Sequence, residues 1–403
     1  MSAIVLIVLV ATACGGTPRH LAGAPAPAGG SVGTMAPPAR LSGVRMLSVS
    51  TGWAWGWRGG RLSLWRTSDG GERWTEVSAP SVTADPSFAS ITGVADFPTA
   101  REGIVAALAS NGIGPLLEVF STVDGGRTWK KVHDAAFAEG GALLSLQMVT
   151  PRDGYLLASA GFAMQREQKT LLRTTDGGRT WQVASSDTGY VPWPRPTSSA
   201  LPEEGDVRTL FRPDGTGFAG TTVELETPSF IGLYRSTNFG ATWRRVALAL
   251  PPGLASQDYT VTQAPVMDGE DGTLIVAVRG KDVATLTYRT SDGGASWTLA
   301  SRLNAMFLAA GFSSSESGLL FSTDGRAWRT SDGGGTWTEM PLPAALARSL
   351  AAGDTIAELD ALSPTVAWMV LLHPSTLSAA DDVTTLFVTH DGGRAWTSQA
   401  LGN

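Results

Sequence analysis

Short apolar stretches alternate with glycine-rich turns along most of this 403-residue chain. Stretches such as 62–67 (LSLWRT) and 285–290 (TLTYRT) are rich in β-branched and aromatic residues and often place an apolar side chain at every second position. Such alternation is typical of strands that bury one face, and flanking glycines are typical of tight turns. The pattern predicts many short strands and an all-β fold.

A nine-residue motif orders these stretches, because it recurs seven times, each time after a strand-like segment. Its copies occupy 66–74, 121–129, 173–181, 235–243, 289–297, 329–337 and 388–396. Successive closing Trp residues are 40 to 62 residues apart, a period that suits one four-stranded blade per repeat. Upstream strands such as 152–160 and 143–149 complete each set of four. The prediction is a seven-bladed β-propeller of four-stranded antiparallel blades over 41–403, closed by packing of blade one on blade seven or by a strand from 15–40.

The motif itself reads as a turn followed by an aromatic anchor. The Asp is expected to accept hydrogen bonds from N–H groups two residues on, the Gly pair to take positive φ, and the Trp to bury its ring. In the fourth copy Asn238, Phe239 and Gly240 replace Asp-Gly-Gly, and Asn tolerates the same geometry. These structural roles are assigned to Asp69, Trp74, Asp124, Trp129, Asp176, Trp181, Asn238, Trp243, Asp292, Trp297, Asp332, Trp337, Asp391 and Trp396.

The N-terminal segment predicts export and attachment to a membrane. Residues 4–13 form a ten-residue apolar run, which matches the core of a signal peptide and is too short to span a membrane. The run ends at Cys14 in the sequence A-T-A-C, which resembles a bacterial lipobox. The resemblance implies a signal peptide over 1–14 that ends at a lipidated Cys14, on the outer face of a bacterial membrane; plain secretion or a short buried strand is the alternative. Residues 15–40 are nearly all Gly, Pro, Ala, Ser and Thr, and predict a flexible tether.

Composition excludes several classes of function. The net charge is −6, from 36 acidic and 30 basic residues, so no basic field favours nucleic acid. One cysteine cannot form an internal disulfide or a thiolate zinc site, and the four histidines are scattered. We therefore expect no metal, no cofactor and no nucleic-acid partner. We also expect that the chain contacts a membrane only through its lipid anchor and that it is a monomer.

The repeated motif also identifies a known type of repeat. The pattern S/T-x-D-G-G-x-T/S-W is the Asp-box, or BNR repeat, and seven copies over 41–401 resemble the propeller of photosystem II stability/assembly factors and their bacterial relatives. The resemblance implies a chaperone-like or scaffold role at a membrane, with a protein or peptide partner in the cell envelope. Because Asp-boxes also occur in sialidases, xyloglucan-cleaving hydrolases and sortilin-type receptors, the motif predicts a propeller and leaves the activity open.

Loop lengths predict which face of the propeller binds. Connections after strands two and four lie on the face opposite the Asp-boxes, and all the long connections fall there, at 160–170, 187–204, 223–230, 250–257, 342–354 and 373–382. Binding residues are usually placed on such loops. The richest loop carries Tyr190, Trp193 and Arg195, the residue types of interface anchors, with a lid packed on blades three and four as the alternative. Solvated charges are expected at Arg166, Glu167, Lys169, Glu224, Glu226, Asp381 and Asp382.

Enzymatic chemistry has weak support in the sequence. A sialidase resemblance would require an arginine triad and a Tyr with a Glu; Arg45 on the first inner strand has no visible companion. No G-x-S-x-G motif occurs, and no carboxylate pair is singled out for glycoside hydrolysis. We assign no catalytic residue. The first hypothesis is a membrane-tethered extracytoplasmic propeller that acts as a non-catalytic protein-binding scaffold or assembly factor. The alternative is a cell-surface carbohydrate-active protein, either a sialidase-like glycoside hydrolase or a glycan-binding lectin.

Overall fold

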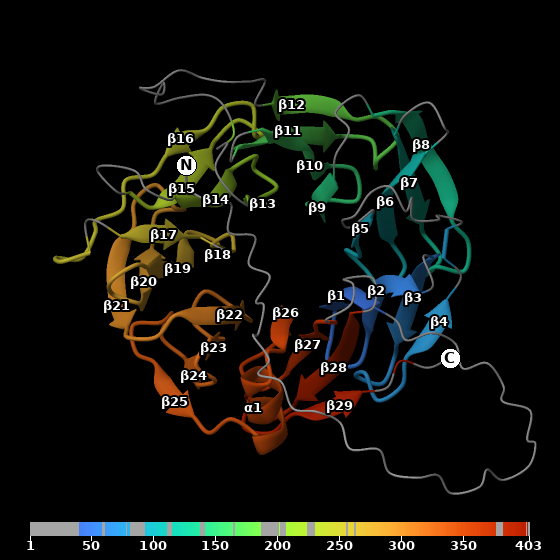
Figure 1. Cartoon of the computed structure of the whole chain (residues 1–403). Helices are drawn as coiled ribbons and strands as arrows, with labels where there is room; N and C mark the ends of the chain where they lie inside the picture. The colour runs from blue at the N-terminus through green and yellow to red at the C-terminus, as the bar shows by residue number, and fades with distance from the viewer. Residues whose placement is uncertain are drawn as a thin grey trace, which may run out of the picture. The chain divides into compact units, whose positions relative to one another are not determined.

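The computed structural model describes residues 40–401, apart from 59–60, 78, 81–92, 111–114, 138–141, 164–165, 187–200, 202–206, 224–229, 255–256, 262, 376–381 and 400. The chain divides into two units at Pro38, and the described residues belong to the second. In that unit, seven groups of antiparallel strands form a ring around a central axis (Figure 1). The predicted all-β, seven-bladed propeller is confirmed.

The blades follow one another in chain order, each from its innermost strand outward. Blades one to three contain β1 (Arg40–Met46), β2 (Gly52–Arg58), β3 (Arg61–Thr67), β4 (Thr75–Val77), β5 (Gly93–Asp96), β6 (Gly103–Ser110), β7 (Pro115–Thr122), β8 (Lys130–Ala136), β9 (Ala142–Met148), β10 (Gly154–Ala163), β11 (Arg166–Thr174) and β12 (Gln182–Ser186). Blades four and five contain β13 (Arg208–Phe211), β14 (Gly217–Val223), β15 (Gly232–Ser236), β16 (Arg244–Arg245), β17 (Asp258–Thr260), β18 (Val266–Asp268), β19 (Asp271–Arg279), β20 (Ala284–Thr290) and β21 (Thr298–Leu303). Blades six and seven contain β22 (Phe307–Phe312), β23 (Gly318–Ser322), β24 (Ala327–Thr330), β25 (Thr338–Met340), β26 (Thr355–Ala361), β27 (Ala367–His373), β28 (Val383–Thr389) and β29 (Thr397–Gln399).

Blades four and five are joined in a way that the repeat did not predict. Five blades are separate four-stranded sheets, whereas these two share one nine-stranded sheet. Thr222 and Val223 of β14 pair with Thr260 and Tyr259 of β17, and β17 also pairs with β19. Blade five therefore has one strand more than predicted, and that strand continues the hydrogen bonding across the boundary between the two blades.

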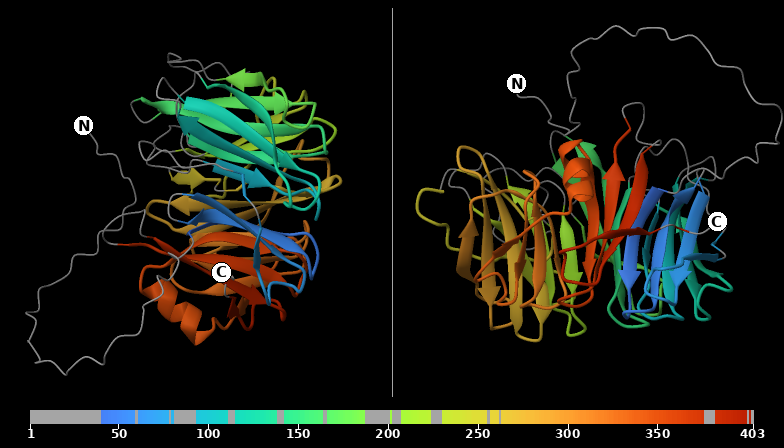
Figure 2. Two further views of the ribbon diagram at one scale, coloured as in Figure 1. Left: turned by 90° about the vertical axis from the view of Figure 1, so that its right-hand side faces the viewer. Right: turned by 90° about the horizontal axis from the view of Figure 1, so that it is seen from below.

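Two segments expected as irregular loops have regular structure. A short helix, α1 (Ala344–Ala351), lies within 342–354, between β25 and β26 on one face of the ring (Figure 2). Its sequence AALARSLA consists largely of strong helix formers.

In 160–170, β10 and β11 form a long hairpin in which Lys169 is fully buried, so the expectation of a solvated Lys169 is wrong. No helix in the described part of the chain is long and apolar enough to span a membrane.

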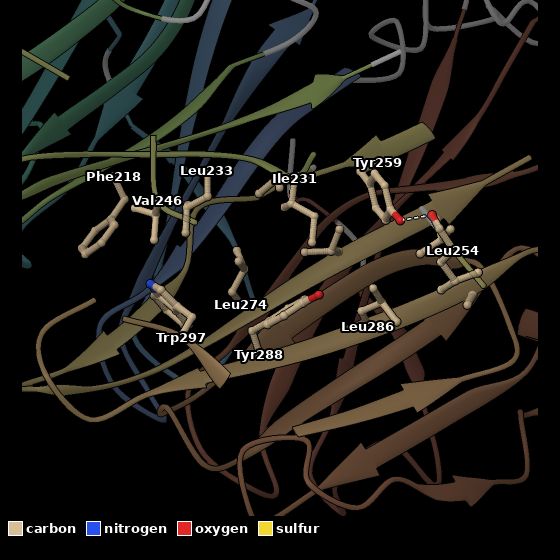
Figure 3. Packing of buried hydrophobic residues seen from close by; sticks show 14 residues of the cluster. Phe218, Ile231, Leu233, Val246, Leu254, Tyr259, Leu274, Leu286, Tyr288 and Trp297 are labelled. Atoms are coloured by element: carbon tan, nitrogen blue, oxygen red, sulfur yellow. Dashed lines mark hydrogen bonds between the residues drawn. The ribbon is translucent and has the colours of Figure 1, made fainter. Parts of the chain in front are cut away.

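Side chains that alternate along the strands fill the spaces between neighbouring blades. Figure 3 shows the space between blades four and five, where Tyr259 and Tyr288 are fully buried. The Tyr288 hydroxyl donates to the Ala249 carbonyl at 2.7 Å, so its polar end is satisfied. The rings of Phe218 and Trp297 meet edge to face with centroids 6.4 Å apart. Each buried ring removes about 150–250 Å² from water, which makes these spaces the main hydrophobic stabilisation of the fold.

The ring closes through the same kind of packing. Trp65 of blade one and Trp368 of blade seven are both fully buried in one cluster. The Leu41 N–H donates to the Thr384 hydroxyl at 2.8 Å across this boundary. Closure by packing of blade one on blade seven is confirmed, while residues 15–39, the source of the alternative strand, lie outside the described residues.

Candidate functional site

The innermost strands line the axis of the ring (Figure 1), and most of them are edge strands of their sheets. An edge strand presents N–H and C=O groups that no neighbouring strand pairs. Four charged residues on these strands gather where blades seven, one and two meet: Glu358 and Asp360 on β26, Arg45 on β1 and Asp96 on β5. They form the candidate functional site, because the positive charge of Arg45 acts on the pKa of all three acids.

The two acids of blade seven bind the inner strand of blade one. Glu358 and Asp360 are two residues apart on β26, so their side chains share one face of the strand. Glu358 Oε2 accepts a hydrogen bond from the Val44 N–H at 3.0 Å, and Asp360 Oδ2 accepts one from the Met46 N–H at 2.8 Å. The two carboxyl groups thereby satisfy N–H groups on the open edge of β1.

Asp96 makes the equivalent contact between blades two and three. Its Oδ2 accepts a hydrogen bond from the Met148 N–H of β9 at 2.7 Å, and its Oδ1 accepts one from the Phe97 N–H at 2.9 Å. Both carboxylate oxygens are thus engaged with backbone, one within the blade and one across the boundary.

Burial dominates the electrostatics of the site. It raises the pKa of Glu358 to about 8, with the like charge of Asp360 adding to the effect. Burial also raises the pKa of Asp360 and of Asp96, against the hydrogen bonds that they accept and the positive charge of Arg45. Arg45 is exposed and forms no ion pair within 4 Å among the described residues. The raised pKa of Glu358 favours its protonated form relative to a free carboxyl.

Glycosidases use two neighbouring carboxyl groups as acid and base, with the pKa of the acid raised by its surroundings. Here, however, each of the three acids has an oxygen committed to a backbone N–H of the next blade. The tyrosines of the described chain pack in the cores between blades, at Tyr155, Tyr234, Tyr259 and Tyr288. Within the described ranges, no group of three His, Cys, Asp or Glu residues is placed to hold a metal ion.

The same contact recurs at other blade boundaries. The Gln147 side chain of β9 both accepts from the Phe211 N–H at 2.8 Å and donates to the Phe211 carbonyl at 3.0 Å. Asp268 of β18 accepts a hydrogen bond from the Ser315 N–H beyond β22. We call these side chains, together with the three axial acids, the inter-blade clasps. Their recurrence at four boundaries indicates that the axial acids hold neighbouring blades together by covering exposed strand edges.

The structure does not test the binding residues expected from the sequence. Tyr190, Trp193, Arg195 and Cys14 lie outside the described residues and stay predictions. Asp382 was expected to be solvated, but its side chain is only 9% exposed. It accepts a hydrogen bond from the Ser375 N–H at 2.8 Å. That expectation is wrong, because the Asp382 carboxylate binds the backbone of the loop that it belongs to.

The seven D-G-G turns have one geometry, which corrects the expected hydrogen bond. In the second copy, Asp124 Oδ1 accepts from the Thr128 N–H at 3.0 Å, four residues on and not two. The Thr128 hydroxyl donates to the other oxygen of Asp124 at 2.6 Å, as the small hydroxyl residue before Trp suggested. The other six copies repeat the bond to the fourth residue, at Asp69, Asp176, Asn238, Asp292, Asp332 and Asp391.

A buried hydroxyl two residues before the Asp completes each turn and was missed. Thr122 accepts from the Gly126 N–H at 3.0 Å and donates to Asp124 at 2.9 Å. The N–H of the first turn Gly, Gly125 in this copy, donates to the carbonyl of Arg101 in the turn between strands one and two at 2.9 Å. This last contact occurs in every blade, with Phe239 in place of that Gly in the fourth copy. The two kinds of turn therefore share one face, as predicted.

The motif Trp residues anchor the turns with different degrees of burial. Trp74, Trp243 and Trp297 are buried, whereas Trp129, Trp181, Trp337 and Trp396 are half-buried. Several indole N–H groups donate back to the turn; that of Trp181, for example, donates to the Gly178 carbonyl at 3.1 Å. Burial of the ring is thus complete in three copies and partial in four.

A periodicity signal could have found the axial acids. In 355–361 (TIAELDA), Glu358 and Asp360 alternate with apolar residues on a segment that had to be an inner strand. On the inner strands only Arg45 stood out, as a residue type that a sialidase triad requires. The partners of the two acids could not be predicted, since the bonded N–H groups at Val44 and Met46 lie more than 300 residues away.

Comparisons with known proteins agree with this architecture. No family model matches the chain. A xyloglucanase from a Paenibacillus species is 26% identical over 256 residues, which is 56% of this chain and 23% of that protein. The chain thus spans less than a quarter of the length of the curated relative that it matches.

Solved structures share the fold at low identity. YCF48 from Cyanidioschyzon merolae matches with a TM-score of 0.53 and 13% identity, covering 88% of this chain and 96% of that one. YCF48 bound to D1 peptide matches with a TM-score of 0.51 and 16% identity, covering 92% and 96%. An ulvan lyase of a polysaccharide lyase family matches with a TM-score of 0.50 and 11% identity, covering 91% and 93%. The expected resemblance to photosystem II assembly factors is confirmed at the level of the propeller fold.

Proposed function

We propose that this chain is a non-catalytic propeller that binds a protein or peptide partner at the cell envelope. The observation that carries the proposal is the engagement of the axial acids. Asp96, Glu358 and Asp360 are the titratable groups best placed for axis chemistry, and each accepts a hydrogen bond from the backbone of the next blade. A carboxylate used in this way helps to hold the ring closed and has fewer oxygens left for a substrate.

The comparison with YCF48 supports a peptide as the class of ligand. A propeller of this fold is bound to D1 peptide in one of the matching structures. We extend only the class, peptide, to the present chain. The anchor-type residues Tyr190, Trp193 and Arg195 remain part of the proposal as contacts on the face opposite the D-G-G turns.

The location proposed is the outer face of a bacterial membrane. Lipidation of Cys14 would fix the chain there, and residues 15–40 would hold the propeller at a distance on the order of 30 Å. Cells that express the chain can be labelled with an alkyne fatty acid. The wild type should take up the label, and Cys14→Ser should lose it and leave the membrane fraction. Equal labelling of the two would contradict lipidation at Cys14.

Depolymerisation of polysaccharides tests the absence of catalysis. The purified full chain is incubated with xyloglucan, arabinan and an acidic polysaccharide, and both new reducing ends and new unsaturated ends are measured. The proposal predicts no product above the buffer control. Product that disappears in Glu358→Gln, while the variant keeps its thermal melting transition, would contradict the proposal.

One observation favours a carbohydrate-active protein as the second candidate. Glu358, with a pKa of about 8, lies two residues from Asp360 on one strand, as an acid and a base of a glycosidase could. The xyloglucanase match is consistent with this candidate. If it is correct, Glu358→Gln should lower kcat far more than KM, because it removes a proton donor and not a binding contact.

A further inference from the structure

A cavity lined by hydroxyl groups lies between blades six and seven, on the face that carries the D-G-G turns. Its volume is about 220 Å³. Its walls come from the turn before β23, from β24 and the D-G-G turn of blade six, and from the turn before β27. They include Ser313, Ser317, Arg329, Ser331, Thr338 and Ser363. Loop lengths in the sequence favour the opposite face, and no sequence pattern pointed to this cavity.

Arg329 is the one charged group among the described residues of the cavity wall, and it differs from Arg66 and Arg289, its counterparts in blades one and five. An Arg precedes the turn in five of the seven copies. Arg66 Nη1 donates to the Gly125 carbonyl at 3.3 Å, and Arg289 Nη1 donates to the Asp332 carbonyl at 2.9 Å. In both cases the guanidinium reaches the D-G-G turn of the next blade. The side chain of Arg329 is exposed. Its guanidinium makes no hydrogen bond, ion pair or ring contact within the described part of the chain.

The turn that Arg329 would reach in the same way leaves space open. The guanidinium of Arg66 lies over Gly125, and that of Arg289 lies over Gly333. Over Gly392, the corresponding glycine of blade seven, the neighbouring atoms are only backbone of residues 364 and 365. Among the described residues, no guanidinium therefore covers the glycine of the blade seven turn, whereas Arg329 and Pro364 both line the cavity.

The residues that line the cavity favour an anion as its ligand. Ser317, Ser331 and Thr338 contribute hydroxyls that have no hydrogen-bond partner among the described residues, so each can donate to an incoming oxygen. Asp332, the acid that follows Ser331 in the chain, directs its oxygens into its own turn, where Thr330 and Thr336 donate to them. A planar guanidinium with hydroxyl donors suits a carboxylate, which it can bind with two parallel hydrogen bonds.

We propose that this cavity binds an acidic side chain, Glu or Asp, of the protein partner. The proposal rests on the proposed function and adds a subsite to it. A volume of 220 Å³ is below the range of pockets for drug-sized ligands and suits one side chain. None of the described residues that line the cavity is aromatic, so they offer no stacking surface for a sugar ring.

Saturation-transfer NMR on the full chain in detergent tests this subsite without knowledge of the partner. The probes are N-acetyl-glutamic acid α-amide, the matching glutamine amide, and methyl glucuronide. The variants are Arg329→Gln and Arg302→Gln, the second being an exposed Arg on β21 outside the cavity that undergoes the same loss of charge. Thermal melting confirms that both variants fold.

The wild type and Arg302→Gln should bind the glutamic acid amide with a Kd of roughly millimolar order. Arg329→Gln should bind it at least about 10-fold more weakly, as should the wild type with the glutamine amide. Equal binding by Arg329→Gln, equal binding of the neutral amide, or tighter Arg329-dependent binding of the glucuronide would overturn the proposal. If the cavity does not bind the glutamic acid amide but a protein partner is found in cells, only the subsite is refuted. If the cavity binds the amide but no protein partner is found, only the proposed function is refuted.

Discussion

The Asp96 carboxylate of blade two accepts a 2.7 Å hydrogen bond from the backbone N–H of Met148 in blade three. The contact joins an inner-strand side chain to the open edge of the next inner strand. The same relation between Glu358 and Val44, across the blade seven to blade one boundary, connects residues 314 positions apart. A side chain in this role stabilises the ring without any substrate.

Removing the acceptor at Asp96 should destabilise the propeller, and Asp96→Asn should do so less than Asp96→Ala. Asp96→Ala leaves the Met148 and Phe97 N–H groups without their partner, at a cost of about 1–2 kcal/mol. Asp96→Asn retains one amide oxygen for the Met148 N–H and removes a carboxyl whose ionisation burial already opposes, but its NH2 group cannot accept from the Phe97 N–H. Urea unfolding at pH 7.5 should rank the Asn variant between the wild type and the Ala variant. The exposed Asp271→Ala serves as control, and a loss of the same size there would argue against the clasp.

The free energy of unfolding should fall as the pH rises, because Glu358 loses its proton. Its folded pKa of about 8 exceeds the usual value near 4.5, so the folded state binds more protons between these values. The corresponding stability is fully present below about pH 4.5 and is lost as the pH rises through 8. Because Glu358 keeps part of its surface exposed, we expect a loss on the order of 2 kcal/mol and not the full linkage.

Glu358→Gln isolates this contribution. Its amide oxygen can still accept from the Val44 N–H but does not titrate. The free energy of unfolding of the variant should change less than that of the wild type between pH 5.5 and pH 8.5, with Asp360 and Asp96 contributing the same sign in both. Parallel pH profiles of the two proteins would contradict the assignment of the raised pKa to Glu358.

The buried hydroxyl of each D-G-G turn should matter as much as the Asp. Thr122→Val removes the acceptor of the buried Gly126 N–H at a cost of about 1–3 kcal/mol. Thr75→Val, an exposed position on β4, is the matched control and should change little. Differential scanning calorimetry compares the two. A melting temperature for Thr122→Val equal to that of the control would show that the hydroxyl is dispensable.

The fourth turn stores strain at Phe239. Its φ is +61°, a conformation in which an L side chain costs about 1 kcal/mol, while its ring stacks under the Arg173 guanidinium at 4.1 Å. Phe239→Ala loses the stack and keeps the strain, so it should destabilise by about 1 kcal/mol. Phe239→Gly loses both and should be near neutral. Denaturation midpoints in which Ala equals or exceeds Gly would contradict strain at this position.

The repeat made the architecture predictable because its information is local. Each D-G-G turn and the strand before it carry their own chemistry, so the number of blades and the face of the turns followed from the sequence. The Thr122 type of hydroxyl was also local, yet its role needed the three-dimensional path of the turn. The helix α1 was missed although 344–351 consists mainly of helix formers, since its place between two blades favoured a loop.

The candidate site was less predictable because it depends on contacts between blades. Nothing local to Glu358 names Val44 as its partner, and nothing local to Arg329 distinguishes it from Arg66. The difference appears only in the folded chain, where the Arg66 guanidinium donates to the Gly125 carbonyl and the Arg329 guanidinium has no partner among the described residues. Contacts of this kind follow from how the blades pack, which a repeat pattern does not specify.

Crosslinking with mass spectrometry in the native cell envelope tests the central claim most directly. The full chain with its N-terminal segment is crosslinked in intact cells, and the linked peptides are identified in replicate and against a strain that lacks the chain. The account predicts one recurrent protein partner, with links that cluster on one face of the propeller. Links scattered over many abundant proteins, with no partner recurring between replicates, would contradict a binding scaffold.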